Sequence, residues 1–172
     1  SCSGALYDAD TGTAVREIRA NLENCDIPSL SPDGATLAVS YGPRGSSDRV
    51  RHIAIYRPVG GQPVHDIVPN RPNIASVAYS PDGSTLAAAG KNGLTLFDPR
   101  TGAPLREIDS EELGDFSGVV WSRDGRRIAA LTKERLACVW DVQTGKMIEK
   151  HPFGGDELAF AGTNLVTTGG GL

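Results

Sequence analysis

The stretch VAYSPDGSTLAAAGKNGLTLFDPRTGAPLREI, residues 77–108, decides the fold. It contains four short runs of apolar and β-compatible residues, and the turn sequences SPDG (residues 80–83), KNG (91–93) and DPRTG (98–102) separate them. In such turns proline presets φ, aspartate hydrogen-bonds to its own backbone, and glycine supplies a positive φ. Short strand-like runs between strong turn signals predict a four-stranded antiparallel meander.

The same pattern recurs on both sides of this stretch. Serine-anchored turns begin at Ser31, Ser80 and Ser122, at intervals of 49 and 42 residues. An aromatic residue closes the third run of each unit, at Tyr7, Tyr56, Phe97 and Trp140. Units of about 40 to 45 residues with four strands each are typical of the blades of a β-propeller. The longer first interval contains an insertion, residues 41–52.

Aromatic-aspartate dipeptides follow the third run at Tyr7-Asp8, Phe97-Asp98 and Trp140-Asp141. The turns that begin at these aspartates read DADTG, DPRTG and DVQTG, and SVAYSPDG (residues 76–83) matches a first strand and its turn. With these motifs the chain resembles the WD-repeat β-propeller family over nearly its whole length. The Gly-His pair that precedes the first strand in typical blades of that family is mostly absent at the aligned positions, as is the aspartate of the second-to-third-strand turn. The resemblance therefore implies degenerate blades of a bacterial type.

We expect an all-β fold, a β-propeller of four-stranded antiparallel blades, formed by residues 1–172 as a single region. The chain opens with the third and fourth strands of one blade, continues with whole blades at residues 25–67, 74–108 and 116–149, and closes with the first and second strands of a further blade. About four blades' worth of strands are present. Three arrangements stay open: a piece of a larger ring with further blades, a homodimer of two halves, or a chain whose end strands share one closing blade.

The composition narrows the classes of partner. The net charge is −4 and no basic tail is present, which disfavours a nucleic acid partner. The chain also lacks an apolar run of about 18 residues, the length that predicts a membrane span. Of the three cysteines, Cys25 and Cys138 fall in predicted strands and are expected to be buried free thiols. Because free thiols are typical of reducing compartments, we expect the protein in the cytoplasm.

The insertion at residues 41–52 is the most individual feature of the chain. A loop there would project from the propeller face that carries the connections between blades. The insertion is basic, whereas a later connection on the same predicted face is acidic, so the two predict a polarised surface able to orient a charged protein partner. Ordinary solvated loops are the alternative. The candidate partner-binding surface comprises Arg44, Arg49, Arg51, His52, Arg71, Asp109, Glu111, Glu112 and Asp115.

No motif in the sequence predicts catalysis. The segment GPRGSS (residues 42–47) lacks the Gly-Lys-Ser/Thr ending of a phosphate-binding loop, and no Gly-x-Ser-x-Gly elbow is present. DADTG (residues 8–12) lacks the ligand pattern of a calcium loop and recurs as a turn. We therefore expect no enzyme activity, no cofactor and no metal. The expected function is a protein-protein interaction scaffold or sensor module that binds its partners through variable loops.

One alternative is a propeller enzyme, or a protein that binds a small ligand or metal through polar residues of the central channel. The residues expected to project into that channel are Asn24, Asp26, Asn73, Ser76, Asp115, Ser117 and Asp156. Acidic and amide oxygens of this kind are able to hold a cation. A third possibility is a structural module whose loops bind nothing.

Overall fold

The computed structural model describes residues 2–7, 10–20, 25–26, 28–42, 51–57, 63–152, 155 and 157–168, and it describes only the backbone of residues 2–6, 15–20 and 168. The fold of these residues is all-β, and the helical segment among them is a short 3₁₀ helix, η1 (Glu111–Leu113). The predicted all-β class with four-stranded antiparallel sheets is confirmed.

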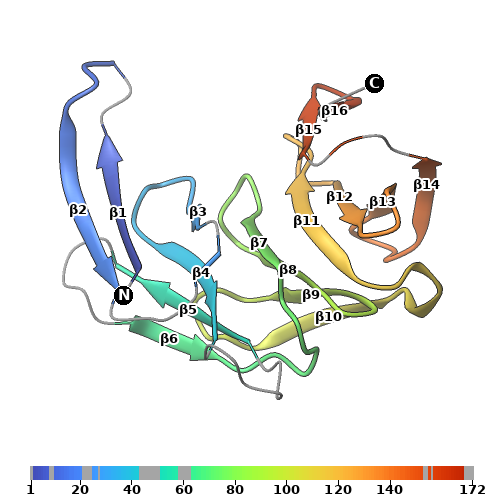
Figure 1. Cartoon of the computed structure of the whole chain (residues 1–172), viewed down its shortest axis with the longest axis horizontal. Helices are drawn as coiled ribbons and strands as arrows, with labels where there is room; N and C mark the ends of the chain where they lie inside the picture. The colour runs from blue at the N-terminus through green and yellow to red at the C-terminus, as the bar shows by residue number, and fades with distance from the viewer. Residues whose placement is uncertain are drawn as a thin grey trace.

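Three four-stranded sheets follow one another along the described chain (Figure 1). Each is a meander in which the spatial order of the strands follows the sequence, as predicted. The first sheet contains β3 (Ser29–Leu30), β4 (Leu37–Tyr41), β5 (His52–Tyr56) and β6 (Pro63–Ile67). The second contains β7 (Ser76–Tyr79), β8 (Leu86–Gly90), β9 (Gly93–Phe97) and β10 (Pro104–Asp109). The third contains β11 (Phe116–Trp121), β12 (Arg127–Thr132), β13 (Leu136–Asp141) and β14 (Met147–Pro152).

Two further strand pairs flank these sheets. β1 (Cys2–Tyr7) pairs with β2 (Ala14–Ala20), and β15 (Glu157–Ala161) pairs with β16 (Asn164–Thr168). The sheets form an arc, with β1–β2 at one end and β15–β16 at the other (Figure 1). The two pairs are separate two-stranded sheets, so the described strands do not show the shared closing blade, one of the three arrangements left open by the sequence.

The first strands of successive sheets are joined along the inner edge of the arc. The backbone N–H of Tyr79 in β7 donates to Ser29 Oγ in β3 at 3.1 Å, and that of Val119 in β11 donates to Ser76 Oγ in β7 at 3.3 Å. The indole N–H of Trp121 donates to the carbonyl of Ala78 at 3.0 Å. Each four-stranded sheet is therefore connected to the next through its innermost strand.

The serine-anchored turn, which we call the SxDG turn, has the same hydrogen bonds in each four-stranded sheet. Its buried serine hydroxyl donates to the aspartate two residues later at 2.6 Å and accepts the N–H five residues later at 2.9–3.0 Å. The aspartate also accepts the N–H two residues beyond itself. Because the serine bond favours the charged carboxylate, the pKa is lowered at Asp33, Asp82 and Asp124.

A bulge recurs beside the aromatic residue that closes each third strand. Tyr56 pairs with Pro63, whereas Ile55 pairs with His65, so Val64 has no partner across the strands. The same register shift leaves Leu105 in the second sheet and Ile148 in the third without a cross-strand partner. The side chains of all three aliphatic residues are exposed. A bulge increases the local twist of a strand pair. No turn or periodicity signal in the sequence predicted these bulges.

The core consists of apolar layers between neighbouring sheets. One cluster between the first and second sheets includes Ile53, Leu86 and Phe97. Another, between the second and third sheets, includes Phe116 and Trp140, whose rings meet edge to face with centroids 5.7 Å apart. The small residues of β8 face both layers, which lets the sheets approach closely. Trp140 is thus a buried residue of the core.

The cysteines differ from the expectation in one respect. Cys138 in β13 is a buried free thiol, as predicted, and burial raises the pKa of this thiol. Cys25 is disulfide-bonded, half-buried and placed before β3, so the prediction of a free thiol in a strand is wrong there. An apolar neighbourhood accommodates a thiol and a disulfide sulfur equally well, and the sequence pattern did not separate them. Since structural disulfides are typical of oxidising compartments, the cysteines no longer favour a reducing one.

Candidate interaction surface

One end of the sheets carries both the connections between sheets and the turns between second and third strands, and we call it the connection end. Here the β8–β9 turn is bonded to the connections on either side of it. The Lys91 N–H donates to the carbonyl of Pro72 at 3.1 Å, and the Asn92 N–H donates to that of Gly114 at 3.0 Å. The candidate residues that the structure describes belong to strands and connections that meet at this end.

The inserted loop is described only at its edges. Arg44 and Arg49 lie outside the described residues. The guanidinium of Arg51 is 2.6 Å from a carboxylate oxygen of Asp26, and the hydroxyl of Ser40 donates to the same oxygen at 2.6 Å. Arg51 is therefore neutralised within the chain by a carboxylate from the segment before the first sheet.

His52 belongs to a small cluster of side chains on the first sheet. Its Nδ1 lies 3.3 Å from both carboxylate oxygens of Asp66, and its ring lies 5.3 Å from that of Tyr41. The hydroxyl of Tyr41 donates to Asp66 at 2.9 Å. Burial, followed by this contact with a carboxylate, raises the pKa of Tyr41 to about 12, so the phenol remains a donor at neutral pH.

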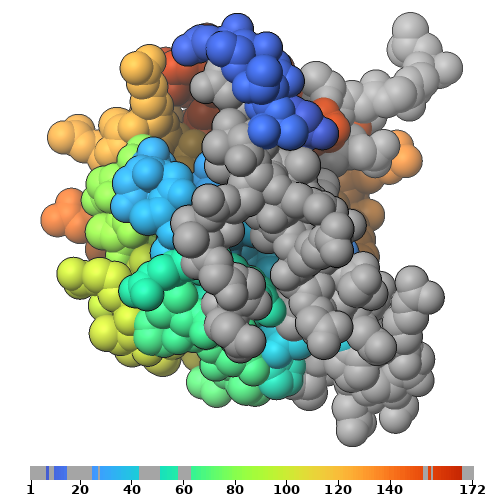
Figure 2. All heavy atoms as spheres, turned by 90° about the vertical axis from the view of Figure 1, so that its left-hand side faces the viewer, coloured from blue at the N-terminus to red at the C-terminus, as the bar shows by residue number. Residues whose placement is uncertain are grey.

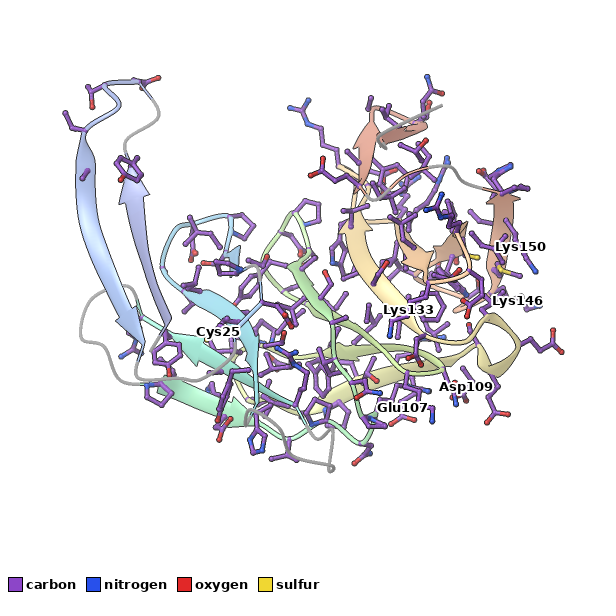
Figure 3. The ribbon with its side chains drawn as sticks, viewed as in Figure 1. Cys25, Glu107, Asp109, Lys133, Lys146 and Lys150 are labelled. Carbon is purple, nitrogen blue, oxygen red and sulfur yellow. The ribbon has the colours of Figure 1, made fainter. Side chains whose placement is uncertain are left out.

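Arg71 is a buried residue that joins the connection before β7 to β10. Its guanidinium donates to the carboxylate of Asp109 and, at 3.1 Å, to the carbonyl of Asn92. The guanidinium also packs against Gly93, where an added Cβ would lie 3.1 Å from it. The structure therefore brings together two predicted site residues as an ion pair between a buried Arg71 and an exposed Asp109 (Figure 3 labels Asp109).

The acidic residues of the connection between β10 and β11 occupy two different environments. The Asp115 carboxylate accepts a hydrogen bond from the ammonium group of Lys133 at 3.1 Å, so the negative charge of Asp115 is compensated. Glu111 and Glu112 lie in η1 with exposed side chains, and neither forms an ion pair with another described residue. Within the candidate set that the structure describes, these two carboxylates are the charges presented outward without compensation.

The inner side of the arc holds a cavity of about 840 Å³. Asp26, Ser76 and Ser117, which we expected to line a central channel, line this cavity. Glu157 of β15 also lines it. The sequence analysis named the preceding residue, Asp156, for the channel and did not name Glu157 itself.

The remaining predicted channel residues are placed differently. Asn73 and Asp115 do not line the inner cavity, and Asn24 and Asp156 lie outside the described residues. In the part of the chain that the structure describes, no group of three or more His, Cys, Asp or Glu side chains is arranged to hold a metal ion.

A smaller cleft, which the sequence analysis did not predict, lies between the outer strands of the first and second sheets. It has a volume of about 230 Å³, and His65, Thr95 and Glu107 are among its lining residues. Figure 2 shows the outer side of these two sheets next to each other, the first in cyan to green and the second in yellow-green to yellow. The sequence signal for the cleft is the threonine itself, because the sister third strands carry Ala54 and Cys138 at the equivalent position.

The chain matches no protein-family model, and no curated protein matches it. Within the described residues, no helix has the length and apolar character needed to cross a membrane.

Proposed function

We propose that the chain is a WD-repeat-type β-propeller region that acts as a non-catalytic protein-protein interaction scaffold or sensor module. The observation that supports this most is repetition, because successive four-stranded sheets share the SxDG turn, the closing aromatic and the bulge beside it. The aspartates after Phe97 and Trp140 also cap their own turns: Asp98 accepts the N–H of Arg100 at 2.8 Å, and Asp141 that of Thr144 at 2.7 Å.

The division of labour between strands and loops supports a binding role. Backbone groups of the strands are engaged in sheet ladders, so recognition falls to side chains at the ends of the sheets. The connections differ in length and charge from sheet to sheet, whereas the SxDG turns repeat the same hydrogen bonds. We therefore place the partner at the connection end, where Glu111 and Glu112 attract a protein with a basic surface.

The test combines affinity capture with binding measurements on the purified partner. Reversing two charges, with Glu111→Lys and Glu112→Lys, is expected to weaken a wild-type interaction by about tenfold or more, because like charges then face each other. The matched control is Glu149→Lys on β14, an exposed carboxylate outside the connection end. Partners that bind both variants equally would contradict the connection end as the surface, and a chain that retains no partner would contradict the scaffold function.

We also propose that the strands at the two ends of the arc complete a propeller. β16 pairs only with β15 and β1 only with β2 among the described strands, and an unpaired sheet edge is a template for association. Light scattering at several concentrations separates the arrangements. A cooperative monomer indicates pairing within one chain, a stable dimer indicates two halves of one ring, and polydisperse association indicates that further blades are needed.

The inner cavity supports a second candidate function, the binding of a small ligand or metal by a propeller enzyme or binding protein. Asp26, Ser76, Ser117 and Glu157 bring oxygen atoms to one concave surface. A ligand that binds only the native state must raise the melting temperature. An unchanged melting temperature in the presence of calcium, magnesium and zinc would contradict metal binding in the inner cavity.

For the compartment, the disulfide at Cys25 supports an oxidising environment over the cytoplasm expected from the sequence. Alkylation of the protein in its native extract, with and without prior reduction, tests this. The expected result is that Cys25 is labelled only after reduction, and labelling without reduction would restore the cytoplasmic expectation.

A further inference from the structure

The cleft between the first two sheets lies between β6 on one side and β9 and β10 on the other. His65 and Ile67 face it from the first sheet, because their strand partners Ile55 and Ile53 belong to the apolar layer between the two sheets. Thr95 and Glu107 are direct cross-strand partners, and both line the cleft from the second sheet.

Thr95 places a polar group at the floor of this cleft. Its side chain is 2% exposed, and Oγ1 makes no hydrogen bond to any described residue. Buried hydroxyls are nearly always paired, because an unpaired one destabilises the fold. The equivalent residues of the sister sheets, Ala54 and Cys138, lie as Thr95 does two positions before the closing aromatic and carry no hydroxyl. Folding alone therefore does not account for an oxygen atom at this position.

The corresponding space between the second and third sheets contains a basic side chain. Strand pairing puts Arg106 of β10 at the position of His65, and Lys150 of β14 at the position of Glu107. The Arg106 guanidinium lies against Gly145, where an added Cβ would be 2.8 Å from it. His65 is shorter than Arg106. The cleft between the first and second sheets is therefore open where Arg106 fills the corresponding space between the second and third sheets.

Two acidic residues line the first cleft, Asp66 and Glu107, and Glu107 is labelled on β10 in Figure 3. The Asp66 carboxylate is engaged by Tyr41 and His52, so Glu107 is the carboxylate considered for an external partner. Its carboxylate accepts the Asn70 amide at 3.4 Å and lies 3.8 Å from the guanidinium of Arg71, which is itself engaged by Asp109. The carboxylate is partly exposed and therefore retains acceptor capacity. Lys150 of β14 and Lys146 in the turn before it, also labelled in Figure 3, lie away from this cleft.

We propose that this cleft binds a basic side chain, arginine or lysine, of a protein partner. The cation pairs with the Glu107 carboxylate and donates to Thr95 Oγ1, while its apolar stem packs against Ile67 and Pro104. A basic residue of the partner would thus fill this cleft, as Arg106 fills the corresponding space between the second and third sheets. The inference deepens the proposed interaction function by naming the chemistry of the partner, and it adds a second contact surface on the rim.

The experiment is a titration of the ¹⁵N-labelled chain, followed by NMR, with acetylated and amidated Gly-Gly-X-Gly-Gly peptides. X is arginine, lysine, citrulline or glutamine, so charge is removed at nearly constant shape. The arginine or lysine peptide is expected to shift the amides of Thr95, Glu107 and Gly102, and the neutral peptides are not. Thr95→Val and Glu107→Gln are each expected to weaken this binding by about tenfold, the range of one charge-assisted hydrogen bond.

Matched variants separate binding from folding. Thr132→Val removes another buried threonine hydroxyl, one that accepts the Leu136 N–H at 3.1 Å, and is expected to leave peptide affinity unchanged. Glu149→Gln removes a carboxylate from β14 and serves as the charge control. Denaturant unfolding is measured for every variant, so that a loss of affinity in a folded protein is assigned to the cleft.

Two results would overturn the proposal: equal binding of the citrulline and arginine peptides, or unchanged affinity after Thr95→Val. Shifts confined to Glu111 and Glu112 would assign the peptide to the connection end and would also overturn it. The proposed scaffold function is judged separately by partner capture. If the peptides do not bind but a protein partner is still captured, only the proposal for this cleft is contradicted. If the peptides bind but no protein partner is captured, only the proposed scaffold function is contradicted.

Discussion

The SxDG turns and the connection end lie at opposite ends of the same sheets, yet they follow different rules. Each SxDG turn repeats the same serine, aspartate and glycine contacts within six residues of chain. At the connection end, contacts differ from sheet to sheet and join distant segments, such as Arg71 with Asp109 and Arg51 with Asp26. The repeat therefore preserves the contacts that each four-stranded sheet needs locally, and the opposite end of the sheet is free to become specific.

The largest expected effect is at Gly93, where the connection end is most tightly packed. An added Cβ would lie 2.3 Å from the Ile108 carbonyl oxygen, at a φ of +152°. Gly93→Ala is therefore expected to lower the free energy of unfolding by about 3 kcal/mol or more. Gly118→Ala, where nothing lies within 4 Å, is the control and is expected to change it by about 0.5 kcal/mol or less. Similar urea midpoints for the two variants would refute this packing argument.

A second prediction concerns the equivalence of the SxDG turns. Ser80→Ala removes the hydroxyl that donates to Asp82 and accepts the Thr85 N–H, at an expected loss of about 1–2 kcal/mol in the free energy of unfolding. Ser31→Ala and Ser122→Ala are expected to lose the same amount to within about 0.5 kcal/mol, since their contacts match. Chemical denaturation of the three variants checks this, and a spread larger than the mean loss would show that the turns are not equivalent.

A third prediction contrasts two buried threonines. Thr132→Val is expected to lose about 1 kcal/mol because its hydroxyl accepts the Leu136 N–H. Thr95→Val removes an unpaired hydroxyl and is expected to leave stability unchanged or to raise it by up to about 1 kcal/mol. Urea unfolding of both variants provides the measurement. A destabilised Thr95→Val protein would mean that this hydroxyl already has a structural partner.

The smallest effect is the pH dependence of the SxDG turns. A carboxylate whose pKa is lowered by folding stabilises the native state above its unfolded pKa, about 3.9, and this contribution is lost as the pH falls through the folded pKa. The combined variant Asp33→Asn, Asp82→Asn, Asp124→Asn is expected to flatten the fall in stability below about pH 4, modestly because these groups are exposed to solvent. Glu111→Gln with Glu112→Gln is the control. An unaltered acid limb in the triple variant would contradict the assignment.

The strands were predictable because their signals are local. The sequence predicted two strands after residue 149, and the structure has them as β15 (Glu157–Ala161) and β16 (Asn164–Thr168). The bulges at Val64, Leu105 and Ile148 were not predictable, because the extra residue in each fourth strand resembles an ordinary β-compatible aliphatic. The inner cavity was predicted in part, since the first strand of each blade was expected to face the centre.

The candidate surface, too, has features that local sequence predicts and features that it does not. Charge patterning placed Arg71, Asp109 and Asp115 among outward charges, and the structure agrees only for Asp109, whose side chain is exposed. Arg71 is buried and paired with Asp109, and Asp115 is paired with Lys133. These pairings join residues from 18 to 38 positions apart, which no local pattern specifies. Glu111 and Glu112 lie in the connection between β10 and β11, where the sequence analysis placed them, and their side chains are exposed.

By itself, the sequence determined the all-β class, the order of the strands and the turns between them. It did so because proline, aspartate, serine and glycine act on the backbone within one turn. Only the tertiary structure decided that Cys25 forms a disulfide, that Arg71 is an internal cation, and that Thr95 faces a cleft while Cys138 faces a filled layer. These outcomes depend on which side chains the neighbouring sheet presents, and that information is distributed along the whole chain.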